Sequence, residues 1–85
     1  MAGMIPQKHP IADIYVPVKR RNALEDDKVA ALAESILENG LEAPILVRTD
    51  EKKGLVLVEG LHRLEACRAL GEEKIECLMV QARQR

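Results

Sequence analysis

A turn with the sequence Gly-Leu-His-Arg, residues Gly60–Arg63, holds the side chains of this chain that are best suited to chemistry. It follows the apolar stretch Leu55–Val58 and precedes a segment whose apolar residues have helical spacing. A helix that begins there leaves unpaired N–H groups and the positive end of its dipole beside His62 and Arg63. Gly60, which has no side chain, would let a ligand approach the backbone. The turn therefore predicts a cradle for an anion such as a phosphate.

A plainer interpretation accounts for the same residues about as well. His62 can be a polar residue at the start of a helix, and Arg63 can pair with the Glu59 carboxylate. If the cradle instead supports phosphoryl transfer or phosphodiester cleavage, His62 is the candidate acid or base and Arg63 stabilises the developing charge. Glu59 is then the nearest carboxylate for a base or for a divalent cation such as Mg²⁺.

Basic and small residues upstream could complete this pocket. Lys28 and Ser35, with Ala31 between them, follow one border of an apolar helical stripe, where small side chains leave room for a phosphate. Arg20 belongs to the basic run Lys19–Arg21. Solvated surface charge is the commoner explanation of both features, so they indicate a phosphate site only together with the Gly-Leu-His-Arg turn.

The amino-acid composition argues against some classes of ligand. Aromatic residues make up 1% of the 85 residues, which argues against recognition of single-stranded nucleic acid by base stacking. The net charge is -1, so any phosphate must be held by a local cluster of cations. Cys67 and Cys77 form no C-x-x-C pair and no zinc spacing. Neither a signal peptide nor an apolar run of about 18–20 residues is present. We therefore expect a reduced, cytoplasmic protein that does not associate with membranes.

An amphipathic helix is the most regular segment of the sequence. Asn22 and Glu25 have the spacing of a capping box, and Asn39-Gly40 is a typical helix end with Leu41 packing back. Five apolar residues between these ends repeat every three to four positions and predict a face in the core. They are Val29, Leu32, Ala33, Ile36 and Leu37.

The remaining elements complete an α+β domain, in which two or three helices pack on a small mixed sheet. Apolar residues between 11 and 18 predict a first strand that Pro17 confines to an edge or ends. The other expected elements are a hairpin of strands 44–48 and 55–58, a helix over 62–70 and a last strand over 74–80. We expect a flexible N-terminus over 1–9, one domain over 10–82 and a tail over 83–85.

These motifs resemble the ParB/sulfiredoxin superfamily over about residues 10–82, nearly the whole chain. The matching segments, in the order of the family, are Lys28–Ile36, Gly40-Leu41, Pro44–Arg48, Leu57–Ala66, Ala69–Gly71 and Ile75. The resemblance implies a ParB/sulfiredoxin-like fold whose Gly-x-His/Arg-Arg turn binds phosphates of a nucleotide or nucleic acid. It also implies that Lys28 and Ser35 are phosphate-contacting helix residues and that Lys19-Arg20 is the basic segment after the first strand.

Two departures distinguish this chain from the main branches of the superfamily. Sulfiredoxins carry their catalytic cysteine directly before the His-Arg pair, where this chain has Leu61, which cannot act as a nucleophile. Cys67 lies more than a turn further on and is typical of a small buried hydrophobe. Chromosome-partition ParB proteins have Arg in place of His62 and continue into a second nucleotide motif and a helix-turn-helix. We therefore expect neither a complete CTP clamp nor centromere-specific binding.

Three functions follow as hypotheses. The first is a stand-alone ParB-like domain that binds DNA phosphates or a nucleoside triphosphate such as ATP or CTP, with or without Mg²⁺, and that could act as a nuclease or phosphotransferase. The second is a non-catalytic regulatory module that binds DNA, a protein partner or a second copy of itself. The third is ATP-dependent reduction of a sulfinic acid, which Leu61 disfavours.

Overall fold

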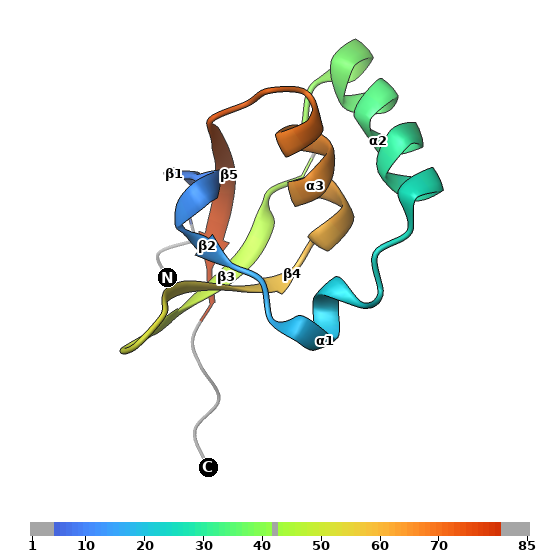
Figure 1. Ribbon diagram of the computed structural model, residues 1–85. Coiled ribbons are helices and arrows are strands. Elements are labelled where there is room, and N and C mark those ends of the chain that lie inside the picture. Colours follow the sequence, from blue (N-terminus) through green and yellow to red (C-terminus); the bar gives the residue numbers. More distant parts are fainter. Residues whose placement is uncertain (1–4, 42, 81–85) are drawn as a thin grey trace.

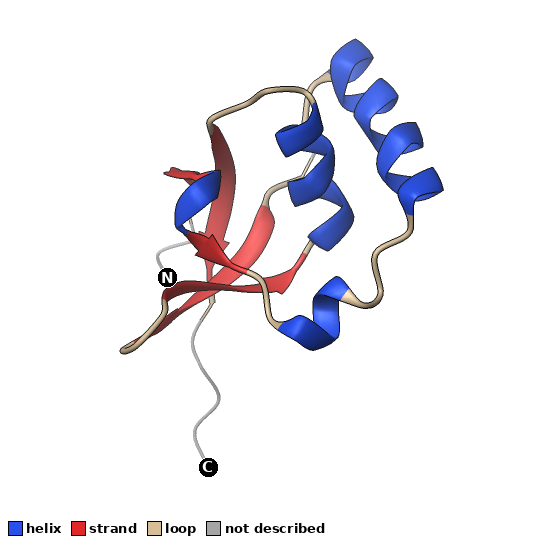
Figure 2. Cartoon of the chain, in the orientation of Figure 1, coloured by secondary structure: helices blue, strands red, loops and turns tan. Residues whose placement is uncertain are grey.

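One five-stranded sheet carries helices on one of its faces (Figures 1 and 2). The computed structural model describes residues 5–41 and 43–80. The elements in chain order are β1 Gln7–Pro10, a 3₁₀ turn Ile11–Asp13, β2 Ile14–Tyr15, α1 Val18–Arg21, α2 Asp26–Asn39, β3 Ile45–Asp50, β4 Gly54–Glu59, α3 Leu61–Ala69 and β5 Lys74–Met79. None of the helices within these two ranges is long and apolar enough to cross a bilayer.

The sheet is mixed, with the strand order β1-β5-β3-β4-β2. β3 and β4 form the expected antiparallel hairpin, and parallel pairs join β3 to β5 and β4 to β2. The Asp50 carboxylate closes the hairpin because it accepts the backbone N–H groups of Lys52 at 2.7 Å and Lys53 at 3.0 Å. The predicted α+β class, with a small mixed sheet and packed helices, is confirmed.

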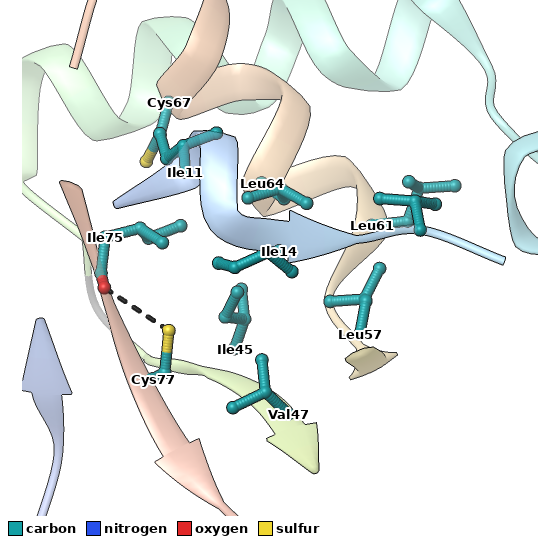
Figure 3. Close-up of a cluster of buried hydrophobic side chains, with 11 residues drawn as sticks. Ile11, Ile14, Ile45, Val47, Leu57, Leu61, Leu64, Cys67, Ile75 and Cys77 are labelled. Carbon is teal, nitrogen blue, oxygen red and sulfur yellow. Dashed lines mark hydrogen bonds between the residues drawn. The ribbon is translucent and has the colours of Figure 1, made fainter. Parts of the chain in front are cut away.

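The core lies between the sheet and α3 (Figure 3). Leu61, Leu64 and Cys67 of α3 face apolar residues of β3, β4 and β5, among which Ile45 and Leu57 are almost fully buried. α2 lies on the far side of α3 from the sheet and packs mainly against α3, with Ile36 also packed against the core (Figure 1). The domain therefore has three layers, and its outermost layer is a single helix.

The expected strand over 11–18 is wrong in most of its length. Ile11–Asp13 form a 3₁₀ turn, β2 is limited to Ile14–Tyr15, and α1 begins at Val18. Ile11 and Ile14 are both buried because one 3₁₀ turn brings residues three apart to one side, not because a strand alternates. Pro17, with φ −58° and no N–H group, ends the extended segment and suits the start of a helix. The basic run Lys19–Arg21 therefore lies within the short helix α1.

The N-terminal segment is also more ordered than expected. Gln7–Pro10 form β1, which pairs with β5 so that His9 lies opposite Ile75. The prediction of a flexible segment over 1–9 is therefore wrong for Gln7–His9. Residues 1–4 and the predicted tail over 83–85 lie outside the described residues.

The start of α2 and its apolar stripe differ from the prediction. Asn22 caps the C-terminus of α1, and the N-cap of α2 is Glu25, whose side chain makes no capping hydrogen bond. No residue of α2 is fully buried, and Leu37 is 75% exposed. α2 packs mainly against α3, so its apolar stripe is covered on a narrower arc than the periodicity predicts. The helix end at Gly40 is confirmed, since its N–H bonds to Ile36 at 2.7 Å and Leu41 packs on the core.

Candidate functional site

Gly60 turns the chain from β4 into α3. Its φ of 109° is left-handed, and its carbonyl accepts the first helical hydrogen bond, from Leu64 N–H at 2.9 Å. A Cβ atom at this position would lie 2.7 Å from Ile45 Cγ2. The glycine is therefore required by its backbone conformation and by the close approach of β3. The space on the side of its Cα where a side chain would lie is filled by Ile45.

A cleft of about 330 Å³ opens at the start of α3. One wall consists of Glu59, Gly60, Leu61, His62 and Arg63. The opposite wall consists of Arg20 in α1, Ala23 in the α1–α2 connection and Leu32 in α2. The structure thus brings together five of the predicted site residues, which are Arg20, Glu59, Gly60, His62 and Arg63.

The two arginines of the cleft come from opposite walls, and neither has a carboxylate partner within residues 5–41 and 43–80. The ion pairs found in the described ranges are Lys28–Glu25, Arg48–Asp50 and Arg68–Glu65. The alternative in which Arg63 pairs with Glu59 is therefore not observed. The first residues of α3 line the same cleft, and their backbone N–H groups have no intrahelical acceptor. Two cations and a helix N-terminus are an arrangement that can hold a phosphate.

Lys28 and Ser35 do not line this cleft. Lys28 Nζ lies 3.5 Å from a Glu25 carboxylate oxygen at the surface, and Ser35 is exposed. Leu32, which is four residues after Lys28 and three before Ser35, does line it. The predicted helix face is therefore directed toward the cleft, but the residue that reaches it is the leucine that the periodicity had assigned to the core.

His62 makes a contact that no local sequence pattern indicates. Its Nε2 atom accepts the backbone N–H of Glu25 at 3.1 Å, across 37 positions of the chain. A ring nitrogen that accepts an N–H must carry a lone pair, so the neutral imidazole holds its proton on Nδ1. Local motifs cannot reveal such a contact, because one partner is a backbone group in a distant turn.

The two cysteines lie outside the cleft and are buried free thiols. Cys77 Sγ donates a hydrogen bond to the Ile75 carbonyl at 3.3 Å (Figure 3). Burial raises the pKa of the Cys77 thiol to about 11, and burial and then the Glu72 charge raise the pKa of the Cys67 thiol. Both thiols are therefore protonated at neutral pH. The expected role of Cys67 as a small buried hydrophobe is confirmed.

Cys77 makes the stability of the fold sensitive to alkaline pH. Its pKa rises from 9.0 to about 11 on folding, so the unfolded chain loses the thiol proton first as the pH increases. This contribution to the free energy of unfolding is complete below pH 9 and is lost between pH 9 and about 11, on the order of 2 kcal/mol. Urea unfolding measures the free energy of unfolding at each pH. We expect this free energy to fall less between pH 8.5 and 10.5 for Cys77→Val than for the unchanged protein. Equal losses in both proteins would contradict the prediction.

Metal binding by the protein alone has little support in the described part of the chain. Residues 5–41 and 43–80 contain no group of three or more His, Cys, Asp or Glu side chains that could hold an ion. Glu59 is the carboxylate at the cleft. A Mg²⁺ ion there would need most of its ligands from phosphate oxygens and water, which is its usual behaviour with nucleotides.

Comparisons with known proteins agree on the family and the fold. The family model of the ParB N-terminal domain matches residues 3–85. A search of curated proteins by sequence gave no significant match. Among solved structures, sulfiredoxin from Arabidopsis thaliana superposes with a TM-score of 0.80 at 29% identity, over 92% of this chain and 86% of that one.

Two larger proteins contain the same fold. The chromosome-partitioning protein ParB from Caulobacter crescentus, complexed with CTP-γ-S, has a TM-score of 0.78 at 23% identity, over 93% of this chain and 46% of that one. A free serine kinase in complex with AMP has a TM-score of 0.78 at 16% identity, over 93% of this chain and 32% of that one. This chain thus spans less than half the length of either protein.

Proposed function

Because this chain belongs to the ParB N-terminal domain family, we propose that it binds the polyphosphate of a nucleoside triphosphate in the cleft at the start of α3. One observation carries the proposal: Arg20 and Arg63, without carboxylate partners in the described residues, both line the cleft at the N-terminus of α3. Charge-assisted hydrogen bonds from such groups are the strongest that a phosphate forms with protein. The nucleotides bound to ParB and to the serine kinase support a ligand of this class.

The phosphate contacts in this proposal belong to Arg63, Arg20 and the first N–H groups of α3. Glu59 would meet a Mg²⁺ ion that arrives bound to the phosphates. Lys28 and Ser35 do not line the cleft, so they are not among the phosphate contacts of this proposal.

The cleft offers fewer specific contacts for the base of a nucleotide than for its phosphates. Tyr15 is the one aromatic residue of the sequence, and its ring lies outside the cleft beneath Lys53 Nζ, 4.2 Å from the ring centroid. Ala23, Leu32 and Leu61 offer apolar contact without a specific hydrogen bond. We therefore propose recognition of the phosphates, with little discrimination between ATP and CTP.

Catalysis is not part of this proposal. Nε2 of His62 is occupied by the Glu25 N–H, so it is not free to take a proton from a substrate. Reduction of a sulfinic acid is disfavoured as well, since position 61 is a buried leucine and both thiols lie away from the cleft. DNA remains the second candidate ligand, because its phosphates would meet the same two arginines.

The test is the Arg63→Ala substitution with Arg68→Ala as its matched control. Both residues lie on α3, but Arg68 pairs with Glu65 at 3.2 Å and does not line the cleft. Loss of a charge-assisted pair costs about 1.5–3 kcal/mol, so we expect Arg63→Ala to weaken ATP and CTP binding about 10- to 150-fold. Arg68→Ala should leave both affinities within about 2-fold.

Isothermal titration with ATP, CTP, inorganic triphosphate and a short DNA duplex separates the candidates. Similar losses for both nucleotides and for triphosphate support phosphate recognition. If Arg63→Ala lost affinity only for the duplex, DNA and not a nucleotide would be the ligand of the cleft. Equal affinities of Arg63→Ala and Arg68→Ala for every probe would show that the cleft is not the binding site.

A further inference from the structure

The two walls of the cleft differ in how firmly they are attached to the domain. Residues 59–63 join β4 to α3, and Leu61 is part of the core. On the other wall, every residue from Val18 to Lys28 is exposed, and α2 has no fully buried residue. Residues 18–28 bury little apolar surface, so the position of this segment depends on the hydrogen bonds that tie it down, whereas the rest of α2 also packs on α3.

One hydrogen bond joins the two walls in the described part of the chain. The Glu25 N–H donates to His62 Nε2 at 3.1 Å, whereas the other hydrogen bonds of residues 18–25 stay within this segment, its neighbours and the first turn of α2. The Glu25 carbonyl also accepts the first helical bonds of α2, from Lys28 N–H and Val29 N–H, each at 3.1 Å. Glu25 thus both starts α2 and attaches α2 to α3.

We infer that His62 is a positioning residue, whose Nε2 atom holds the α1–α2 connection and the start of α2 against the N-terminus of α3. The hydrogen bond between His62 and Glu25 would thereby set the distance between Arg20 and Arg63 across the cleft. Its effect on ligand binding rests on the proposed function. Without the bond, the wall that carries Arg20 and Ala23 is free to move away from Arg63. The two arginines must then be brought together by the ligand itself, which weakens binding.

Three variants test this role. His62→Gln places an amide oxygen where Nε2 lies and keeps the acceptor, while His62→Leu has similar size and removes it. His9→Leu makes the same chemical change in β1, away from the cleft, and is the matched control. The readouts are amide hydrogen exchange at Glu25 without ligand, ¹⁵N shifts of the imidazole nitrogens, and titration with ATP.

The expected results follow from the loss of one hydrogen bond. In His62→Leu, exchange at Glu25 should accelerate and ATP binding should weaken, each about 3- to 10-fold. His62→Gln should restore both to within about 2-fold of the unchanged protein, and His9→Leu should alter neither. At pH 8 the ¹⁵N shifts of His62 should show an unprotonated Nε2 and a protonated Nδ1.

Other outcomes overturn the inference. If Gln and Leu weaken ATP binding equally while exchange at Glu25 stays unchanged, His62 contacts the ligand directly and does not position the wall. A protonated Nε2 in the neutral ring would refute the bond in the unchanged protein, without any variant. If exchange responds as expected but ATP does not bind, the proposed function fails, the link to the cleft fails with it, and only the contact between the helices stands.

Discussion

Gly60→Ala is expected to destabilise the domain by about 2–5 kcal/mol. Two effects add at this position. A residue with a Cβ atom disfavours the φ of 109°, and the new methyl group would lie 2.7 Å from Ile45 Cγ2. Ile45 is 1% exposed and belongs to the core, so it has little space to move into. The substitution should also displace the start of α3 and with it the cleft.

Gly54→Ala is the matched control. Gly54 has a φ of 81°, but a Cβ atom there would meet nothing within 4 Å. Only the conformational term applies, so we expect a loss of about 1–2 kcal/mol. Urea unfolding followed by circular dichroism measures both variants. Equal losses would mean that the contact with Ile45 contributes nothing and that backbone conformation alone accounts for the requirement for glycine.

Leu64→Ala should cost about 3–5 kcal/mol, enough to unfold much of so small a domain at physiological temperature. Leu64 is 0% exposed and lies at the centre of the α3 face that packs on the sheet (Figure 3). Removing three buried carbon atoms loses their transfer free energy and leaves a cavity that the sheet cannot close. The midpoint of thermal unfolding should fall by about 4–8 °C for each kcal/mol.

Substitutions in α2 provide the comparison for Leu64→Ala. Full burial of their apolar stripe would imply losses of about 2–5 kcal/mol for Leu32→Ala or Ile36→Ala. Both side chains are only half-buried, so we now expect about 1–2 kcal/mol for Ile36→Ala and almost none for Leu37→Ala, where the side chain is 75% exposed. If Ile36→Ala destabilised the protein as much as Leu64→Ala, the packing of this half-buried residue on the core would contribute as much as that of a fully buried one, contrary to the expectation.

Local patterns were sufficient for the second half of the chain. The hairpin, α3 and β5 follow directly from short apolar runs separated by residues with turn chemistry, such as Asp50 and Gly71. These elements are adjacent in sequence and pack on one another, so local preference and tertiary contact agree. Gly60 was correctly placed at the end of a strand, although for a reason that only its contact with Ile45 reveals.

The first half depended on contacts that no local pattern encodes. β1 exists because Gln7–Pro10 pair with β5, more than sixty positions away. α2 has the periodicity of a core helix, yet α3 already covers the sheet, so α2 forms an outer layer.

The candidate site also has one part that local sequence predicts and another part that only tertiary contacts set. The sequence by itself determined the turn Gly60–Arg63 and its helix N-terminus, because a glycine at the end of a strand and the polar residues after it are local signals. Only the tertiary structure decided that Arg20 lies across a cleft from Arg63, that Leu32 takes the place expected for Lys28 and Ser35, and that His62 binds the Glu25 backbone. Those relations join segments about forty residues apart, and they arise from how α2 packs on α3, which depends on the shapes of both helices and not on the residues of either one alone.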